Sequence, residues 1–441
     1  MKIEDLKSLL RENGIVGAGG AGFPTYAKLD KRADTLILNC AECEPLLRLH
    51  RQVLKMFTHE ILSTLSLIAK TVEADNVYVG VKGSYKRTVE AINAELESFP
   101  NIKVCKLPEV YPAGDEVVLT YEATGRVVPA GEIPLSVGVT VLNVETVYNI
   151  YRAMQNLPVT HKYVTVTGEV ASPVTVYAPI GTSVRDLIKF AGGVTAENTA
   201  IILGGPMMGN LGSEADVVTK TTNAVLVLPE NLPLVQKKLS KTAIDMKRAM
   251  SACCQCSYCT SLCPRNLLGH PIDPSAFMYA ASNGITNDAV PYLNSAFCSG
   301  CGLCEMYSCG QGLSPRMLLT ACKSSLRAKG VKPPKSPEMH FVDNARPNRM
   351  IPLSRLRSRL GLDPYNKSAP VAEKDIKVKK LKILLSQHIG APATAIVCKG
   401  DKVEAGQIIA AAAENALSVN IHASLSGTVA EVNNKSITIT L

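Results

Sequence analysis

The chain of 441 residues contains no tryptophan, and aromatic residues make up only 5% of it. No uninterrupted apolar run approaches the roughly 20 residues that a membrane-spanning helix needs, so the sequence predicts no transmembrane segment. The first residues, Met1-Lys2-Ile3-Glu4-Asp5, lack the apolar core of a secretory signal. We therefore expect a cytoplasmic protein in a reducing compartment, where free thiols survive.

Charge is only mildly unbalanced, with 47 basic and 38 acidic residues giving a net charge of +9. The basic excess is concentrated between Lys323 and Lys382, in a stretch that prolines interrupt. A nucleic-acid surface needs basic residues on a patterned face with interleaved aromatics, and this stretch has neither. The sequence therefore predicts a solvated linker over residues 331–378 and no nucleic-acid partner.

Cysteine, by contrast, is abundant, and eight of the 14 cysteines form two regular combs. The first comb is Cys253-x2-Cys256-x2-Cys259-x3-Cys263, and the second is Cys298-x2-Cys301-x2-Cys304-x4-Cys309. Such runs of three plus one thiolate are typical of 4Fe–4S clusters. In two-cluster ferredoxins the fourth cysteine of each comb binds the other cluster. The expected ligand sets are Cys253, Cys256, Cys259 and Cys309 for one cluster, and Cys298, Cys301, Cys304 and Cys263 for the other.

Zinc and disulfides are the alternatives to clusters. Structural zinc sites use ligands in two pairs, and disulfides belong to small domains in oxidising compartments. The second comb departs from the commonest spacing, with four residues before Cys309 and Gly310 after it. The other cysteines are expected to be inert thiols: Cys40, Cys43, Cys105, Cys254, Cys322 and Cys398.

The first third of the chain alternates predicted strands and helices. Apolar strand segments cover 35–39, 77–81 and 102–107, and helical segments cover 59–73 and 84–96. This alternation predicts an α/β domain with a largely parallel sheet, ending near residue 157.

The remaining residues predict three further units, so the fold class is multidomain α/β. A hairpin and a short helix indicate a β-grasp module, the two combs lie on a mainly helical scaffold, and short strands separated by glycines indicate a small all-β barrel sandwich. The predicted boundaries are 1–157, 158–235, 240–330, a linker over 331–378, and 379–441.

A glycine-rich stretch, Gly14 to Thr25, follows the first predicted helix. Glycines let backbone N–H groups approach a phosphate closely, but glycine clusters are often only turns. The stretch is not a dinucleotide-binding fingerprint, because no strand immediately precedes it and no clear helix follows. It is not a Walker loop either, because no Gly-Lys-Ser/Thr follows.

The surroundings of this loop resemble the FMN subunit of respiratory complex I and its relative in the Rnf complex, the C subunit. The likeness rests on Gly17 to Lys28, Asn39 to Pro45, Gly114-Asp115-Glu116 and Asn143 to Thr146, in that order. It implies that an FMN is cradled by Gly17, Gly19, Gly20, Gly22 and Lys28, and lined by Asn39, Glu42, Glu116 and Asn143. It also implies that Glu44 faces NADH. Of the aromatics that hold NADH in the complex I protein, only Phe23 has a match, so FMN is better supported than NADH. Without the loop, these carboxylates would be taken as solvated loop residues.

Two other segments resemble known modules. Residues 163–193 are similar to the soluble-ligand-binding β-grasp domain, which could hold a cobalamin or act as a spacer. The final strands are similar to biotinyl and lipoyl barrel sandwiches, but the stretch 414–419, at the expected hairpin tip, contains no lysine. This domain is therefore expected to pack or dock and to carry no swinging arm.

The whole order of modules resembles the cobalamin (corrin) reductases of propanediol-utilisation microcompartments, soluble relatives of the Rnf protein. The barrel sandwich comes last here, as in those reductases, whereas it usually comes first in the Rnf relative. The resemblance implies an enzyme that passes electrons from NADH through FMN and two 4Fe–4S clusters to cobalamin inside a bacterial microcompartment. It also implies docking to an adenosyltransferase or a shell protein. The alternatives are an Rnf-type electron-transfer protein that reduces a protein acceptor, and a cluster-bearing scaffold without flavin.

Overall fold

A computed structural model describes residues 1–333 and 341–441 of the chain. Its first domain is built on a parallel four-stranded sheet in the order β3-β2-β1-β5. The strands are β1 (Thr35–Cys40), β2 (Asn76–Lys82), β3 (Ile102–Leu107) and β5 (Val139–Asn143). These strands are short apolar runs, buried almost throughout in β1 and β5, because helices cover both faces of the sheet.

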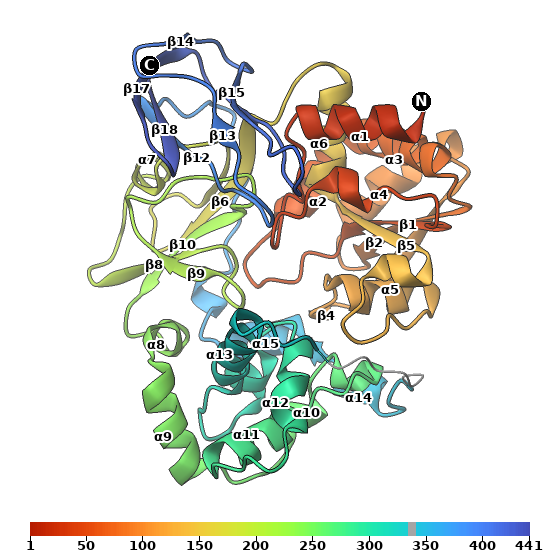
Figure 1. Ribbon diagram of the computed structural model, residues 1–441, viewed down its shortest axis with the longest axis vertical. Helices are drawn as coiled ribbons and strands as arrows, with labels where there is room; N and C mark the ends of the chain where they lie inside the picture. The colour runs from red at the N-terminus through yellow and green to blue at the C-terminus, as the bar shows by residue number, and fades with distance from the viewer. Residues whose placement is uncertain (334–340) are drawn as a thin grey trace.

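One face of this sheet packs on a large apolar core that includes residues of five helices (Figure 1). These helices are α1 (Ile3–Glu12), α2 (Leu49–Met56), α3 (Thr58–Val72), α4 (Lys86–Glu95) and α6 (Val144–Met154). The other face is covered by α5 (Glu116–Thr124) and has its own smaller core. This arrangement confirms the predicted α/β domain with a parallel sheet.

The second domain is a five-stranded mixed sheet in the order β7-β6-β10-β8-β9, with one helix, as predicted for a β-grasp module. Its elements are β6 (His161–Gly168), β7 (Val174–Pro179), α7 (Val184–Phe190), β8 (Thr199–Leu203), β9 (Asn210–Gly212) and β10 (Ala224–Pro229). The central strand β10 runs parallel to β6 and antiparallel to β8. Helix α7 packs over this sheet through Val184, Leu187 and Ile188.

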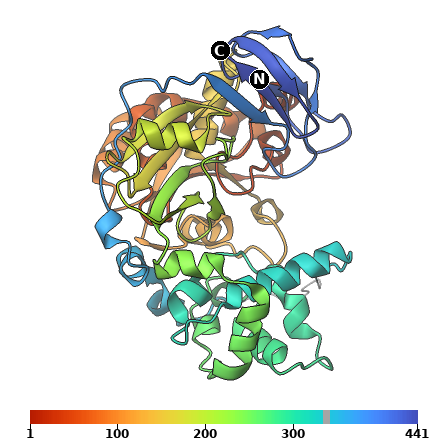
Figure 2. The same cartoon turned by 90° about the vertical axis from the view of Figure 1, so that its left-hand side faces the viewer.

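The third domain carries both cysteine combs on short helices at the end of the molecule farthest from the C-terminal strands (Figures 1 and 2). Its α-helices are α8 (Pro233–Leu239), α9 (Thr242–Ala252), α10 (Tyr258–Ser261), α11 (Pro274–Ser282), α12 (Val290–Asn294) and α13 (Pro315–Ala328). The second comb ends in a π-helical turn, Cys304–Ser308, directly before Cys309. The extra residue in that comb is therefore taken up by a widened helical turn.

The stretch after these helices differs from the expected solvated linker. Residues 334–340 of it lie outside the described residues, but α14 (Arg346–Arg349), β11 (Ile351–Pro352) and α15 (Leu353–Arg359) follow. Strand β11 pairs with β4 (Val110–Tyr111) of the first domain. Ile351, together with Leu356 and other α15 neighbours, is buried in a core that the prolines and basic residues of this stretch did not reveal.

The C-terminal domain consists of two small antiparallel sheets, as expected for a barrel sandwich. One sheet holds β12 (Lys380–Leu384), β14 (Lys402–Val403), β17 (Gly427–Val432) and β18 (Ser436–Thr440), and the other holds β13 (Thr394–Ala395), β15 (Ile408–Ala411) and β16 (Ile421–His422). A separate apolar core lies between them. Among the described residues, we find no helix with the length and apolar character needed to span a bilayer.

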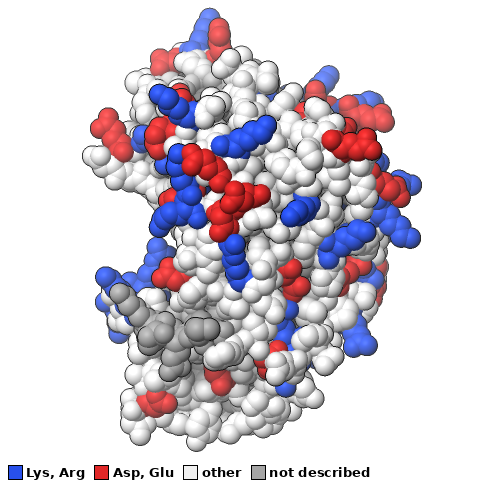
Figure 3. Space-filling view, turned by 90° about the vertical axis from the view of Figure 1, so that its right-hand side faces the viewer, with Lys and Arg blue, Asp and Glu red and all other residues white. Residues whose placement is uncertain are grey.

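Charged side chains are interleaved over the face drawn in Figure 3, with Lys and Arg next to Asp and Glu. Inside the molecule the pattern is different, because a few charges are fully buried between domains. Lys162 on β6 pairs with Glu145 on α6, and the two side chains are only 1% and 2% exposed. The Tyr163 N–H donates to the second oxygen of Glu145 at 3.1 Å. This pair joins the β-grasp domain to the first domain.

We predict that Lys162→Met lowers the free energy of unfolding by about 3–5 kcal/mol, because it leaves the Glu145 carboxylate buried without its cation. The change should appear as a lower urea midpoint in the first unfolding transition. Lys7→Met is the matched control, since Lys7 pairs with Glu4 on the surface and such pairs contribute about 0–1 kcal/mol. The double variant Lys162→Met/Glu145→Leu should recover most of the loss. Equal effects of Lys162→Met and Lys7→Met would contradict the prediction.

Candidate flavin cavity and cysteine quartets

A cavity of about 440 Å³ lies at the carboxyl ends of β1 and β5. These strands are neighbours, and Asn39 at the end of β1 is in register with Asn143 at the end of β5. From β1 the chain moves outward to β2 and β3, whereas β5 lies on the other side of β1. The strand order therefore changes direction between β1 and β5, which is where open α/β sheets bind ligands.

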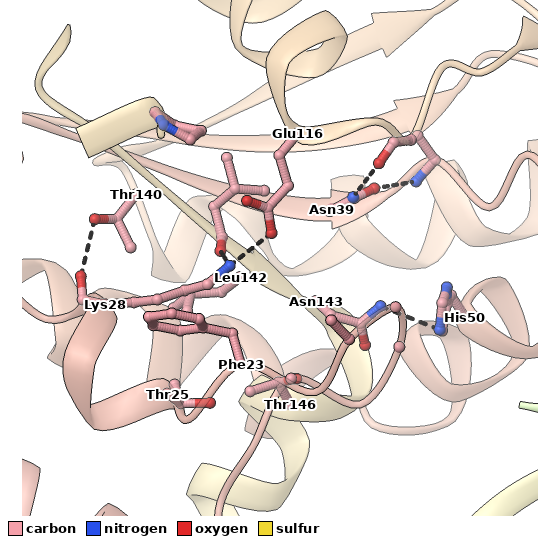
Figure 4. A pocket seen from close by; sticks show the side chains of 18 of the residues that line it. Phe23, Thr25, Lys28, Asn39, His50, Glu116, Thr140, Leu142, Asn143 and Thr146 are labelled. Carbon is pink, nitrogen blue, oxygen red and sulfur yellow. Dashed lines mark hydrogen bonds and ion pairs between the residues drawn. The ribbon is translucent and has the colours of Figure 1, made fainter. Parts of the chain in front are cut away.

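The cavity collects nearly all of the residues that the sequence singled out for a flavin (Figure 4). The predicted residues that line it are Gly17, Gly19, Gly20, Lys28, Asn39, Glu42, Glu44, Glu116 and Asn143. Gly22 is not among the lining residues. A Cβ at Gly22 would lie 2.6 Å from the Thr221 Cγ2 and 3.2 Å from His388, so this glycine permits close packing of the β-grasp and C-terminal domains on the loop.

The glycine loop folds back on itself as a small hairpin. The Gly17 N–H donates to the Phe23 carbonyl at 2.9 Å, and Val16 bridges to Pro24. The Ala18 N–H donates to the Thr146 hydroxyl at 2.9 Å, which fixes the loop to the start of α6. Gly20 has a φ of +63°, which non-glycine residues adopt only with strain. The loop is thus anchored at its base, while its tip faces the cavity.

Several polar side chains around the cavity hold one another in place (Figure 4). The Lys28 ammonium donates to a Glu116 carboxylate oxygen at 2.6 Å and to the Val141 carbonyl at 3.2 Å. The Asn39 amide donates to the Gly114 carbonyl at 3.0 Å. The Asn143 side chain caps α6 through its oxygen, with the Glu145 N–H at 2.9 Å. The polar groups are therefore positioned by the backbone around them.

Two polar atoms that line the cavity are buried without a hydrogen-bond partner among the described residues. They are the Thr25 hydroxyl and one carboxylate oxygen of Glu42. Burial raises the pKa of Glu42 to about 7 and lowers the pKa of His50 to about 3, so this imidazole is neutral at physiological pH. Buried polar atoms normally have partners, so these two residues of the cavity lining have unused hydrogen-bonding capacity.

Glu44 lines the cavity but its carboxylate is bound by another domain. The backbone N–H groups of Met207 and Met208 donate to its two oxygens at 2.8 and 2.9 Å. Burial raises the pKa of Glu44, although these two hydrogen bonds act in the opposite direction. A Cβ at Gly205 would lie 2.2 Å from the Glu44 side chain, so the loop can approach only because this residue is glycine.

Two further lining residues, His50 and Asn223, lie outside the motifs that the sequence singled out. Asn223 comes from the β-grasp domain, immediately before β10. Its side-chain oxygen accepts from the Lys162 ammonium at 2.7 Å, and its amide nitrogen faces Gly19, where a Cβ would lie 3.0 Å away. Only the packing of two domains brings this asparagine to the glycine loop, so no local pattern could have found it.

The sequence predicts that the eight comb cysteines, all in the third domain, form two sets that exchange their fourth members. We call Cys263, Cys298, Cys301 and Cys304 the Cys301 quartet, and Cys253, Cys256, Cys259 and Cys309 the Cys256 quartet. Burial raises the pKa of Cys304 and, to about 11, that of Cys263, and other thiols of the Cys301 quartet add to both effects. Burial likewise raises the pKa of Cys259 to about 12, with contributions from Cys256 and Cys309. The thiols thus lie near the partners that the crossed arrangement expects.

Backbone N–H groups are directed at sulfurs in both quartets. The Gly300 N–H lies 3.4 Å from the Cys298 sulfur, and the Leu313 N–H lies 3.3 Å from the Cys309 sulfur. Among the described residues, no three His, Cys, Asp or Glu side chains converge closely enough to hold a single metal ion. The corners of a cubane cluster hold thiolates farther apart than one ion does, so the two findings are compatible.

Four family models match consecutive parts of the chain. The Nuo51 FMN-binding domain matches residues 10–152, the SLBB domain matches 163–211, the 4Fe-4S dicluster domain matches 252–314, and the RnfC barrel sandwich hybrid domain matches 359–440. These matches confirm the predicted fold class and its order of modules. The last match begins in α15, within the stretch expected to be linker.

Solved structures and curated proteins extend these likenesses. An NAD+-reducing [NiFe]-hydrogenase in the H2-reduced state has a TM-score of 0.50 and 20% identity, over 82% of this chain and 67% of that chain, which shows a shared fold. A component of a proton-translocating ferredoxin:NAD(+) oxidoreductase complex from Clostridium ljungdahlii, its C subunit, is 33% identical over 60% of this chain and 57% of its own length.

Two longer matches decide the family. Cobalamin reductase PduS of Salmonella typhimurium is 38% identical over 100% of this chain and 97% of its own length. Cobalamin reductase PduS of Citrobacter freundii is 39% identical over 99% of this chain and 96% of its own length. Because both matches run through every domain described above, the chain belongs to the PduS cobalamin reductase family.

Proposed function

We propose that this chain is an NADH-dependent cobalamin reductase that uses FMN and two 4Fe–4S clusters. The observation that carries the proposal is the combination, in one chain, of a cavity in an FMN-binding domain with two cysteine quartets. The full-length similarity to cobalamin reductases supports a corrinoid as the substrate. Electron transfer of this kind needs no general acid or nucleophile, and the sequence contained no convincing triad.

The cavity fits a flavin in size and in chemistry. Its volume of about 440 Å³ falls within the range of small-molecule sites, roughly 300–1,000 Å³. The unpartnered Thr25 hydroxyl and Glu42 oxygen offer polar contacts that only a ligand or water can complete. A Cβ at Gly114 would lie 2.6 Å from the Ala41 carbonyl oxygen, so a larger residue at this position of the cavity wall would clash with the backbone.

We propose that backbone N–H groups of the glycine loop and the Lys28 ammonium bind the FMN, because both present positive charge to a phosphate. Asn39, Glu116 and Asn143 would orient the flavin, since each is already held by the backbone or by Lys28. When bound, FMN accepts two electrons as a hydride and releases them singly. The hydrogen-bonded lining would keep water from the reacting atoms.

The two quartets fit 4Fe–4S clusters, because each provides four thiols and N–H groups directed at sulfur. We propose that the Cys301 quartet and the Cys256 quartet each hold one cluster, which carries one electron at a time. Hydrogen bonds to the thiolates and the apolar surroundings would set the reduction potentials of the bound clusters. The protein chain would therefore set the distances between the electron carriers and their reduction potentials.

Donation by NADH is supported by the FMN-binding family and by Glu44, which lines the cavity. Both oxygens of Glu44 are bound by Met207 and Met208 in this structure. Contact between Glu44 and a nucleotide would require residues 204–209 to move away, or the nucleotide to bind beside the loop. We propose that Glu44 faces the nicotinamide nucleotide in one of these two ways.

Three further features are proposed. They are the predicted domain boundaries, a corrinoid site in the β-grasp domain, and docking to an adenosyltransferase or shell protein. Enclosure in a bacterial microcompartment is supported by the family of the relatives.

We predict that anaerobically purified protein contains about one FMN and about eight irons per chain, the number for two cubanes. It should reduce cobalamin with NADH, because all carriers belong to the same chain. Flavin fluorescence, iron analysis and the cobalamin spectrum are the measurements. NADH oxidation with artificial acceptors but never with cobalamin would instead favour an Rnf-type electron-transfer protein, in agreement with the partial match to the clostridial relative. Protein without flavin would support the scaffold alternative.

We predict that Lys28→Met weakens FMN binding by about tenfold, or about 1.4 kcal/mol, because it removes the cation at the glycine loop. Titration of the flavin-depleted protein, followed by flavin fluorescence, measures the dissociation constant. Lys31→Met is the matched control, since Lys31 pairs with Glu73 on the surface and does not line the cavity. Iron content should be the same in both variants. Unchanged FMN affinity in Lys28→Met would remove Lys28 from the site.

A further inference from the structure

The two cysteine quartets contact different parts of the protein, and these contacts indicate the order in which electrons reach them. We infer that electrons pass from the flavin cavity to the Cys301 quartet first, and that they leave the protein through the Cys256 quartet at the exposed end of α9, α10 and α11. The inference rests on the proposed function and adds the route and the place where the acceptor is reduced.

Tyr111 connects the cavity wall to the Cys301 quartet. Its hydroxyl donates to the Cys301 carbonyl at 2.7 Å, and its side chain is buried. Tyr111 and Cys301 belong to the same apolar cluster as Leu47, which lines the cavity, and Cys43, another lining residue, packs against that cluster. A continuous apolar layer therefore joins the cavity to Cys301.

Two further contacts reach the same quartet from the cavity. Met207 donates its N–H to Glu44, and its Cε would lie 3.5 Å from a Cβ at Gly302, the residue after Cys301. On the other side, Arg265, which follows Cys263 closely in the chain, pairs at 2.8 Å with Asp115, the residue before Glu116. Tyr111, Met207 and Arg265 thus link the Cys301 quartet to the cavity wall or to residues beside it.

The Cys256 quartet packs elsewhere. Cys253 and Cys309 contact an apolar cluster formed by residues of α9, α11 and α13 and the segment before α13. None of the described members of that cluster lines the cavity. Cys298 of the Cys301 quartet contacts the same cluster, so the two quartets adjoin there. The cavity, the Cys301 quartet and the Cys256 quartet therefore follow one another in space.

Exposure changes along the same route. In the Cys301 quartet three cysteines are buried and Cys298 is half-buried, whereas in the Cys256 quartet Cys256 is exposed and the other three are half-buried. Large apolar side chains beside it also face solvent, with Met250 65% and Tyr258 60% exposed. An acceptor can therefore come much closer to the Cys256 quartet than to the Cys301 quartet.

The redox balance follows from the carriers. For each NADH oxidised to NAD+, one proton is released and two electrons travel along the route one at a time. Two cobalt(III) corrinoids each gain one electron at the Cys256 quartet and become cobalt(II). No other oxidant or reductant is required.

The test removes one quartet at a time in the full-length, flavin-loaded protein. Cys256→Ala should lower the iron content from about eight to about four per chain. After anaerobic addition of NADH, its remaining cluster should still become reduced, seen as an electron paramagnetic resonance signal. Cobalamin reduction should fall at least tenfold. In Cys301→Ala, NADH should bleach the flavin absorbance, but the remaining cluster should stay oxidised.

Cys254→Ala is the matched control, because Cys254 is exposed, adjoins the first comb and belongs to neither quartet. It should keep the iron content, the signal and the cobalamin rate of the unaltered protein. If Cys301→Ala does not fold, the results from Cys256→Ala alone test the order of the two quartets. A remaining cluster that NADH cannot reduce in Cys256→Ala, or a cobalamin rate equal to that of Cys254→Ala, overturns the order. If the unaltered protein shows the expected signals but never reduces cobalamin, the order stands and the proposed substrate fails.

Discussion

The arrangement of this protein depends on charges that are buried between its first two domains and must stay paired. The Glu145 carboxylate lies on the first domain and its cation, Lys162, on the β-grasp domain. The Glu44 carboxylate lies beside the cavity and its two N–H donors lie on the loop after β8. If the domains separated, each carboxylate would lose its partner. A carboxylate that stays buried without a partner is destabilising unless water replaces that partner. The domains are therefore fixed to each other at the cavity.

This constraint has a consequence for the cavity and for the quartets. The same Lys162 that pairs with Glu145 orients Asn223 toward the glycine loop. The loop that binds Glu44 also carries Met207 to the Cys301 quartet. One set of interdomain contacts thus completes the wall of the flavin cavity and holds the first cysteine quartet against it. Transfer of single electrons requires short and constant separations, and rigid contacts of this kind supply them.

The C-terminal domain strengthens the same junction from the opposite side. The Lys220 ammonium of the β-grasp domain donates to the Gly14 carbonyl at 2.8 Å and to the Asn420 carbonyl at 2.9 Å, and so touches three domains. Burial lowers the pKa of Lys220 to about 7, in keeping with a site that offers carbonyls and no carboxylate. His388 packs on Gly22 of the glycine loop. These contacts agree with a barrel sandwich that packs on its neighbours.

The sequence alone determined what depends on local spacing. The combs Cys253 to Cys263 and Cys298 to Cys309 are recognisable because cluster ligation requires thiols at short, regular intervals. The α/β fold followed from strand periodicity, and nine lining residues followed from the resemblance of the glycine loop and its neighbouring motifs to FMN-binding subunits. Tertiary structure decided everything that joins distant parts of the chain. Asn223 at the cavity, the partners of Glu44, the packing role of Gly22 and the buried α15 depend on contacts between residues far apart in sequence. No local pattern encodes such contacts, because they arise only when separately folded surfaces bury one another.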